Sequence, residues 1–395
     1  MTGSTMAPLA PVQQRGRQAL ERLGLPNRGQ EDWRLTNLKR LETLARLPLA
    51  KAPSDIPLPL APDAGLRLVL DGVHDPLDGV SLPNGLSPLP TAELQQALGH
   101  TLDRCGCAEA WPVELNHASS QHVLALRVRG EAPPLELVMA GGAGLTSTRV
   151  LLLVEEKATL ELLQVCLSEG ASAQSHVLEV HLGQEAQLRH GLLAAADGEA
   201  SFLAHLAVEQ EPRSSYQLTS VVQGWSLGRI EPRVLQVDGQ ALTKLQGLAV
   251  TDGEQQLATH SSVRFDGPEG ELDQMQKCLA AGRSHVIFNG AIQVPRQAQR
   301  TNAAQLSRNL LLSERARVDT KPELEIVADD VRCAHGATVS QLQEDELFYL
   351  RSRGISATDA AALLLRGACL DVINQLPGLA DRWQPLNRVM QGLSR

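Results

Sequence analysis

The chain has 395 residues, of which 43% are hydrophobic and 21% charged, and its formal net charge is -9. This length favours two or three globular domains and excludes a small module that depends on disulfides. The acidic balance argues against binding of nucleic acid, which requires a basic protein surface. The sequence has no run of about 18 apolar residues, so no membrane span is predicted.

The amino-terminal segment is predicted to be helical and to end in a proline-rich linker. The pattern covers residues 12–47 with a break between Gly24 and Gly29, after which apolar residues recur near a spacing of three, and five prolines then follow within residues 48–62. Residues 66–70 are predicted to form a strand, and a further helix is expected to begin after Thr91, with Thr91 as its cap. We therefore assign residues 1–115 to an N-terminal helical domain with a linker.

The central segment, residues 116–340, is predicted to be β structure throughout. Apolar and polar residues alternate in short runs that Gly, Asp or Pro separate. No helix-length interruption supplies the crossovers that a βαβ fold requires. This pattern alone is compatible with a sandwich, a barrel or a solenoid.

A repeat within the central segment favours the solenoid. A small or polar residue followed by an apolar step recurs at Ala158, Ala186, Ser215 and Ala241. A near-constant period in the twenties is typical of stacked coils, and we therefore predict a parallel β-helix. Because the chain has only four Phe, four Trp and two Tyr, the interior is expected to be mainly aliphatic.

Helical patterns return after residue 340. Acidic residues at 344–346 suit the first turn of one helix, and Ser356 begins a near-capping box for a second. A third helix is expected over residues 379–393. Residues 341–395 are thus assigned to a C-terminal helical domain, which can cover an open coil edge and offer surfaces to other chains.

The cysteine content and the amino terminus indicate a cytoplasmic protein. Six cysteines in a chain of this length are sparse, and their irregular spacing is unlike a disulfide framework. The first residues lack the basic region and the long apolar run of a secretion signal. We therefore expect a reducing, cytoplasmic environment.

Three motifs with known chemistry are absent or incomplete in this sequence. No lysine follows a glycine, so a phosphate-binding loop that ends in Gly-Lys is absent and ATP hydrolysis by that route is excluded. Residues 224–228 match the G-x-S-x-G pattern around a hydrolase serine, Ser226, but a proline and strand alternation follow where a helix is required. Cys105 and Cys107 form a lone pair without a second pair at zinc-site spacing.

Cys333 and His335 differ from the other candidates because two metal-binding side chains are two positions apart. In an extended segment this offset places both on one face, with their Cβ atoms about 6 to 7 Å apart. Thiolate and imidazole suit zinc, copper and iron-sulfur chemistry. Two ligands are too few for a closed site, so a partner would have to complete it. By spacing alone, a buried cysteine beside an incidental histidine is the alternative.

Long, nearly contiguous motifs lie between residues 285 and 356. They are Asn289-Gly290 and residues 299–303, 308–313, 319–326, 333–338 and 347–355. Together they resemble the SufB/SufD family of iron-sulfur cluster assembly proteins. Residues 31–38 are also similar to the E-x-W-[KR]-x-T-x-L pattern near the start of SufD members. The Cys-x-His-Gly-Ala-Thr motif favours the SufD branch over the SufB branch.

The resemblance implies the architecture and the partners of this family. The implied fold is a right-handed parallel β-helix between an N-terminal and a C-terminal helical domain, in agreement with the division above. The β-helix is then expected to pair with SufB, and the C-terminal helices, with Leu347, Phe348 and Leu350, are expected to bind the ATPase SufC. The chain itself would be a non-catalytic subunit, and the surface that meets SufB is also compatible with a homodimer.

The resemblance also implies a role for His335. This residue is expected to bind iron or the nascent iron-sulfur cluster at the SufB interface, with Cys333 beside it. The cluster would be transient in the complex, and none is expected in the isolated chain. The other five cysteines match no ligand motif of the family. Two alternatives stay open: a purely structural scaffold, and a carbohydrate-active β-helix enzyme.

Overall fold

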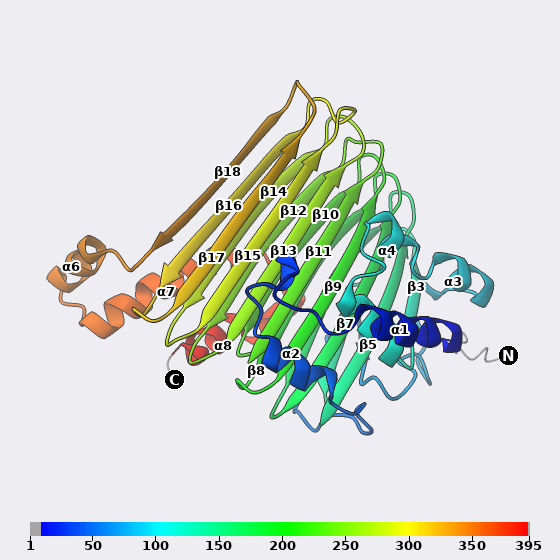
Figure 1. Ribbon diagram of the computed structural model, residues 1–395, viewed down its shortest axis with the longest axis horizontal. Coiled ribbons are helices and arrows are strands. Elements are labelled where there is room, and N and C mark those ends of the chain that lie inside the picture. The colour runs from blue at the N-terminus through cyan, green and yellow to red at the C-terminus, as the bar shows by residue number, and fades with distance from the viewer. Residues whose placement is uncertain (1–8, 394–395) are drawn as a thin grey trace.

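The structure is a computed structural model that describes residues 9–393, and it shows a long parallel β-solenoid with helices at both ends (Figure 1). Within these residues the strands form two nine-stranded sheets. The even sheet contains, in spatial order, β1 (Leu66–Val69), β4 (Leu135–Gly141), β6 (Thr159–Ser168), β8 (Gln187–Ala196), β10 (Ser215–Gln223), β12 (Leu242–Thr251), β14 (Glu271–Ala280), β16 (Asn302–Leu311) and β18 (Arg332–Ser340). The odd sheet contains β2 (Leu86–Pro88), β3 (Leu124–Val128), β5 (Gly144–Val154), β7 (Ser172–Leu182), β9 (Ser201–Gln210), β11 (Leu227–Gln236), β13 (Gln256–Phe265), β15 (His285–Val294) and β17 (Arg317–Ile326).

Consecutive strands of the solenoid alternate between the two sheets. Each strand from β3 to β16 pairs in parallel with the strand two positions further along the chain. Leu160 lies opposite Leu188, and Leu188 lies opposite Tyr216, so successive coils advance along the chain by the same step as the sequence repeat. The predicted period is therefore the length of one coil, and the predicted parallel β-helix is confirmed.

The interior between the two sheets is mainly aliphatic, as predicted. Leucine, valine and alanine make up most of the buried side chains that the two sheets enclose. The main aromatic contact there is a stack of Phe202 on Trp225, with ring centroids 4.8 Å apart. Removing this apolar surface from water, at about 25 cal/mol per Å² buried, is the main term that stabilises the coils.

Helices cover the outer faces of both sheets. On the odd sheet, Trp33, Leu41 and Trp111 belong to a cluster that packs against β5, β7, β9 and β11. The elements of this N-terminal layer are α1 (Ala10–Leu23), the 3-10 turn η1 (Glu31–Trp33), α2 (Leu38–Ala45), α3 (Thr91–Ala97), α4 (His100–Arg104) and α5 (Trp111–Ser119). Because the central strands have a core on one face and helices on the other, they are buried along nearly their whole length.

The C-terminal helices cover the even sheet unequally. Val372 and Trp383 pack with apolar residues of β6, β8, β10 and β12. The elements are α6 (Glu344–Ser352), α7 (Ala357–Ile373), the 3-10 turn η2 (Gly378–Trp383) and α8 (Pro385–Gly392). Helix α6 has no buried residue and projects from the rest of the molecule (Figure 1).

The two ends of the solenoid differ. At the first end, β1 extends the even sheet and β2 pairs antiparallel with β3, while Leu77 and Leu82 between them pack against the interior. At the other end, β17 and β18 each have a neighbouring strand on one side only within the described chain. Their residues are almost all half-buried or exposed. We call this end, formed by β17 and β18, the open end.

Two local predictions about helix boundaries are wrong. Thr91 is the first residue of α3 and does not cap it, because the preceding proline occupies the cap position. The helix expected over residues 379–393 is divided into η2 and α8, because Gln384 adopts a φ of 49° and Pro385 starts a new helix. The predicted cap of α7 is confirmed, since the Ser356 hydroxyl accepts a backbone hydrogen bond from the first turn.

A chain of buried hydrogen bonds crosses the interior. Tyr216 Oη lies 3.0 Å from His190 Nδ1, and His190 Nε2 lies 2.8 Å from Gln164 Oε1. Gln164 Nε2 lies 2.9 Å from His176 Nε2, and His176 Nδ1 lies 2.8 Å from Thr148 Oγ1. Because an amide oxygen accepts and an amide nitrogen donates, His190 carries its proton on Nε2 and His176 on Nδ1. Burial lowers the pKa of His176 to about 4 and that of His190 to about 3, so both rings are neutral.

We predict that the protein loses stability as the pH falls from 6.5 towards 4. Unfolding exposes His176 and His190 to water and returns their pKa values to about 6.5, so the unfolded chain binds more protons in this range. Each histidine then removes about 1.4 kcal/mol of unfolding free energy per pH unit. Urea unfolding at pH 7, 6 and 5 measures the slope, which should be shallower in His190→Gln. Equal stability of the native chain at pH 7 and pH 5 would contradict the assignment.

Candidate functional site

Strand β18 carries the predicted ligands at the open end of the solenoid. It pairs in parallel with β16, so that Cys333 lies opposite Ala303 and His335 lies opposite Gln305. In the described chain the other edge of β18 has no neighbouring strand. A row of its backbone N–H and C=O groups therefore points away from the solenoid, where another strand can pair with it.

Cys333 and His335 lie on the inward face of β18. Their neighbours across the ladder, Ala303 and Gln305, are both buried inside the solenoid. Cys333 is half-buried and packs against the interior, whereas His335 is exposed because no coil follows. The two side chains thus lie where the interior of the solenoid opens to solvent.

The two side chains differ in their readiness to bind a metal ion. Partial burial raises the pKa of the Cys333 thiol, so this group has to lose a proton before it can bind iron. A neutral imidazole, by contrast, offers a nitrogen lone pair without losing a proton. In residues 9–393 no group of three or more His, Cys, Asp or Glu side chains is arranged to hold a metal ion. Any site built on His335 would need ligands from elsewhere.

Inward-facing residues that lie opposite one another on successive strands of the even sheet form a column that ends at His335, and its last three members are polar. Leu245 lies opposite Gln274, Gln274 lies opposite Gln305, and Gln305 lies opposite His335. Both glutamines are buried. Sequence reasoning missed them, because only the register between coils aligns them with His335.

Comparison with known proteins identifies the family. Residues 137–368, which run from β4 into α7, match the sequence profile described as SUF system FeS cluster assembly, SufBD core domain. The iron-sulfur cluster assembly SufBD family protein slr0076 of Synechocystis sp. is 30% identical over 398 aligned residues, which cover 90% of this chain and 84% of that protein. The chain belongs to the SufBD family.

A relative named SufD makes the chain SufD-like. The iron-sulfur cluster assembly protein SufD of Escherichia coli is 28% identical, over 97% of this chain and 93% of that protein. Protein ABCI7, chloroplastic, of Arabidopsis thaliana is 38% identical over 248 residues, which cover 62% of this chain and 52% of that protein. Family membership and the SufD likeness inferred from the motifs are both confirmed.

Two of the motifs that carry the SufBD resemblance meet in the structure. Lys321 of β17 forms ion pairs with Glu31 of η1 and with Glu323, and these partners raise the pKa of Lys321 to about 12. Trp33 of the same N-terminal motif packs under the Arg229 guanidinium, 4.1 Å from its ring centroid. The N-terminal motif thus connects η1 to the odd sheet and reaches the last coil.

The remaining cysteines of this SufBD protein lie outside β18. Cys166 and Cys278 face the interior, Cys107 lies in a cluster with α4 and α5, and Cys369 packs between α7 and the even sheet. Burial raises the pKa of Cys105 and of Cys278 to about 12. These thiols are therefore protonated at neutral pH and contribute to packing.

Ser226 lies in the turn between β10 and β11. Strand β11 follows directly, so the helix that would raise a hydrolase serine is replaced by β structure. Gly224 has a φ of 74°, and a Cβ there would overlap the carbonyl group of Ala196. The Ser226 carbonyl accepts a hydrogen bond from Arg40. The interpretation of this motif as a turn is confirmed.

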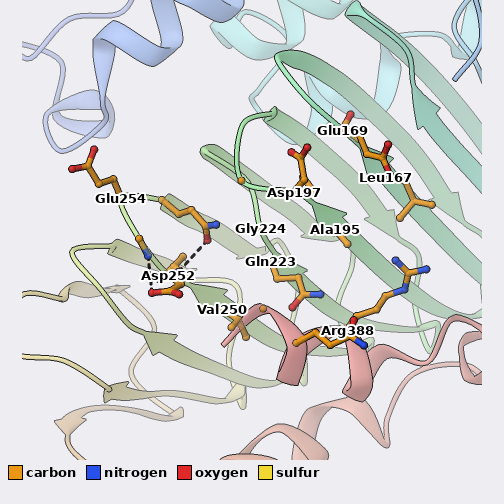
Figure 2. Close-up of a pocket in the computed structure, with 18 of the residues that line it drawn as sticks. Leu167, Glu169, Ala195, Asp197, Gln223, Gly224, Val250, Asp252, Glu254 and Arg388 are labelled. Carbon is orange, nitrogen blue, oxygen red and sulfur yellow. Dashed lines mark hydrogen bonds between the residues drawn. The ribbon is translucent and has the colours of Figure 1, made fainter. Parts of the chain in front are cut away.

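A pocket of about 560 Å³ lies at the turns that connect the two sheets, beside α8 (Figure 2). Three of the four carboxylates that line it have partners: Asp197 accepts from the backbone of Gly170, Asp252 accepts from Gly253, and Glu254 pairs with an arginine. These groups stabilise the turns of successive coils. The pocket is therefore a consequence of how α8 meets the turns and is separate from β18.

The C-terminal elements of this SufBD chain divide into a packed part and an exposed part. On α6, Phe348 is 72% exposed and Tyr349 is 58% exposed, whereas Leu347 and Leu350 are half-buried. Helix α7 is anchored by Lys277 of β14, whose ammonium group lies 2.5 Å from the Asp371 carboxylate. Among the described helices, none has the length and apolar character needed to cross a membrane.

Proposed function

We propose that this protein is a SufD-like subunit of a SufB-SufC-SufD scaffold that assembles iron-sulfur clusters. In this proposal the open end pairs with SufB, and His335 offers a ligand for iron or the nascent cluster, with Cys333 beside it. The observation that carries the proposal is the position of His335: it is exposed on the inward face of an edge strand, within a family motif.

The open end has the features of a surface that pairs with another solenoid. Half-buried apolar residues of the last coil, including Val318, Leu324 and Val331, face solvent beside the unpaired edge of β18. A related solenoid could continue both sheets and cover these residues, because its strands have the same spacing. The same geometry is compatible with a homodimer.

A cluster site that is shared between two chains can both hold and release its cargo. Iron and sulfide have to be held during assembly and released afterwards, and a site that two chains share can be opened by moving one of them. His335 supplies an imidazole, and the partner supplies the remaining ligands. The cluster is thus cargo of the complex, and the isolated chain has no resident cofactor.

The proposal assigns ATP hydrolysis to SufC and leaves this chain non-catalytic. The exposed aromatic residues of α6 are the surface offered to SufC, because an apolar patch of this kind favours a protein partner. We expect a cytoplasmic location, without nucleic acid or membrane partners. Membership of the SufBD family favours cluster assembly over a carbohydrate-active enzyme, and the purely structural scaffold is the alternative that experiment has to separate.

We predict that His335→Ala abolishes most cluster assembly while the protein stays folded. The side chain is exposed, so its removal should change the free energy of unfolding by less than about 0.5 kcal/mol. Iron and sulfide in the co-purified SufB-SufC-SufD complex should fall by about tenfold or more, since a ligand is lost. His100→Ala, which removes another exposed histidine from α4, is the matched control. An iron content equal to wild type in His335→Ala would favour the structural scaffold.

We further predict that Phe348→Ser combined with Tyr349→Ser prevents co-purification of SufC. These substitutions are preferable to deleting residues 344–395, because α7 and α8 belong to the packed core and their loss would expose the even sheet. The thermal midpoint of the variant should equal that of wild type. Leu60→Ser changes an exposed leucine of the N-terminal linker and should leave binding intact. Retained SufC binding by the double variant would refute the assignment of α6.

A further inference from the structure

Three buried polar side chains form a line that leads to His335. Gln274 Nε2 donates to Ser261 Oγ at 2.7 Å, and Gln305 Nε2 donates to Gln274 Oε1 at 2.9 Å. All three residues are buried, and Gln305 is only 2% exposed. Each amide nitrogen therefore donates away from the open end, towards the preceding coil.

The last residue of this line, Gln305, has an acceptor that receives no hydrogen bond. Gln305 Oε1 is buried and has no hydrogen-bond partner among the described residues. Exchanging the oxygen and nitrogen of the Gln305 amide alone would set Gln305 Oε1 against Gln274 Oε1, two acceptors that repel. In the arrangement in which Gln274 donates to Ser261, the Gln305 oxygen therefore stays unpaired, and because burying it unpaired is unfavourable, it requires a donor.

His335 is the donor that the register provides. It lies directly opposite Gln305 on the neighbouring strand, on the same face, at the strand spacing of about 4.8 Å. The ring is exposed, so it is free to turn inward towards the amide oxygen. A neutral imidazole carries one N–H and one bare nitrogen, so it can satisfy Gln305 and still keep a lone pair.

Gly290 provides the space in which the Gln305 amide lies. Ser261, Gly290 and Pro322 occupy one register row of the odd sheet. A Cβ on Gly290 would lie 2.8 Å from Gln305 Cδ, which is closer than side-chain carbons approach. The Asn-Gly motif of the sequence thus has a physical reason, since glycine leaves room for an amide that extends from the opposite sheet.

We infer that Gln305 is a positioning residue for His335. Its Oε1 accepts a hydrogen bond from one ring N–H and so fixes the tautomer, which leaves the other ring nitrogen free to bind iron. Gly290 holds the amide in place for this contact. The inference rests on the proposed ligand role of His335 and adds the group that orients it.

The first test measures the tautomer directly. In the full-length chain labelled with 15N-histidine, the ring signals of His335 are assigned by their loss in His335→Ala and recorded at a pH at which the ring is neutral. We expect one protonated and one bare nitrogen in wild type. In Gln305→Met and Gly290→Ala, the two shifts should approach each other, because both tautomers become populated. Averaged shifts in wild type would overturn the inference.

The second test measures affinity for ferrous iron alone, titrated anaerobically into the co-purified SufB-SufC-SufD complex. Gln305→Met keeps the side-chain length but removes the acceptor, and Gly290→Ala keeps Gln305 but displaces its amide. Both should weaken iron binding by about tenfold or more. If Gln305→Met does not assemble with its partners, Gly290→Ala decides the question by the same criterion, because the nearest neighbours of its added Cβ are side-chain atoms, those of the Gln305 amide and of the Phe288 ring.

The neighbouring coil supplies matched controls. Gln276 is also a buried amide, and it occupies the space beside Gly247, which lies opposite it on the neighbouring strand of the same sheet. Gln276→Met and Gly247→Ala should cause similar packing changes without affecting the tautomer or the iron affinity. Equal weakening by the control pair would show that packing alone is responsible and would overturn the inference.

The outcomes also separate this inference from the proposed function. If His335→Ala binds ferrous iron as tightly as wild type, the ligand role itself fails and the inference falls with it. If His335→Ala weakens binding but Gln305→Met and Gly290→Ala do not, the ligand role stands and the positioning role of Gln305 is refuted.

Discussion

The parallel pairing of each coil with the next determines where this protein can act. Such a stack satisfies the backbone of every internal strand but leaves the last strand of each sheet with one unpaired edge. At the first end, the terminal strands β1 and β2 are short and the segment between them packs against the interior, whereas β17 and β18 present long unpaired edges at the other end. Association by strand addition is therefore directed to one end of the molecule, and the motif with Cys333 and His335 lies there.

Polar side chains follow one another inside the solenoid near the open end. In one inward column of the even sheet, His190 is followed by Leu218 and Leu245, and then Gln274, Gln305 and His335 follow in the next three coils. Polar groups inside a protein are costly unless they are hydrogen-bonded, so a polar column is not expected from packing alone. In the proposed function, the polar end of this column orients the ligand at the site that two chains share.

The sequence predicted the features that depend on local patterns. Alternation of period two identified the strands, and the recurrence with a period in the twenties identified the coils, because both repeat along the chain itself. The shared face of Cys333 and His335 was also predictable from local sequence, because residues two positions apart lie on one face of a strand. The register with β16 shows that this face is the inward one. The cap at Ser356 was also predictable, since a cap needs only a few adjacent residues.

Features that depend on contacts between distant residues were not predictable. The ion pair of Lys321 with Glu31 joins residues from opposite ends of the chain, and the alignment of Gln305 with His335 depends on the register of two coils. The sequence pattern also did not predict the division of the last helix at Gln384. The apolar spacing continues across this residue, although its backbone is left-handed. Tertiary structure decides each of these features.

Hydrogen-deuterium exchange of the chain, alone and with SufB, tests the central claim most directly. The account predicts that the outer backbone amides of β18 and β17 exchange rapidly in the chain alone and become protected when SufB binds, while the central strands are protected in both states. Protection that appears only on the N-terminal helices or at the turns beside α8, with β18 unchanged, would contradict the account.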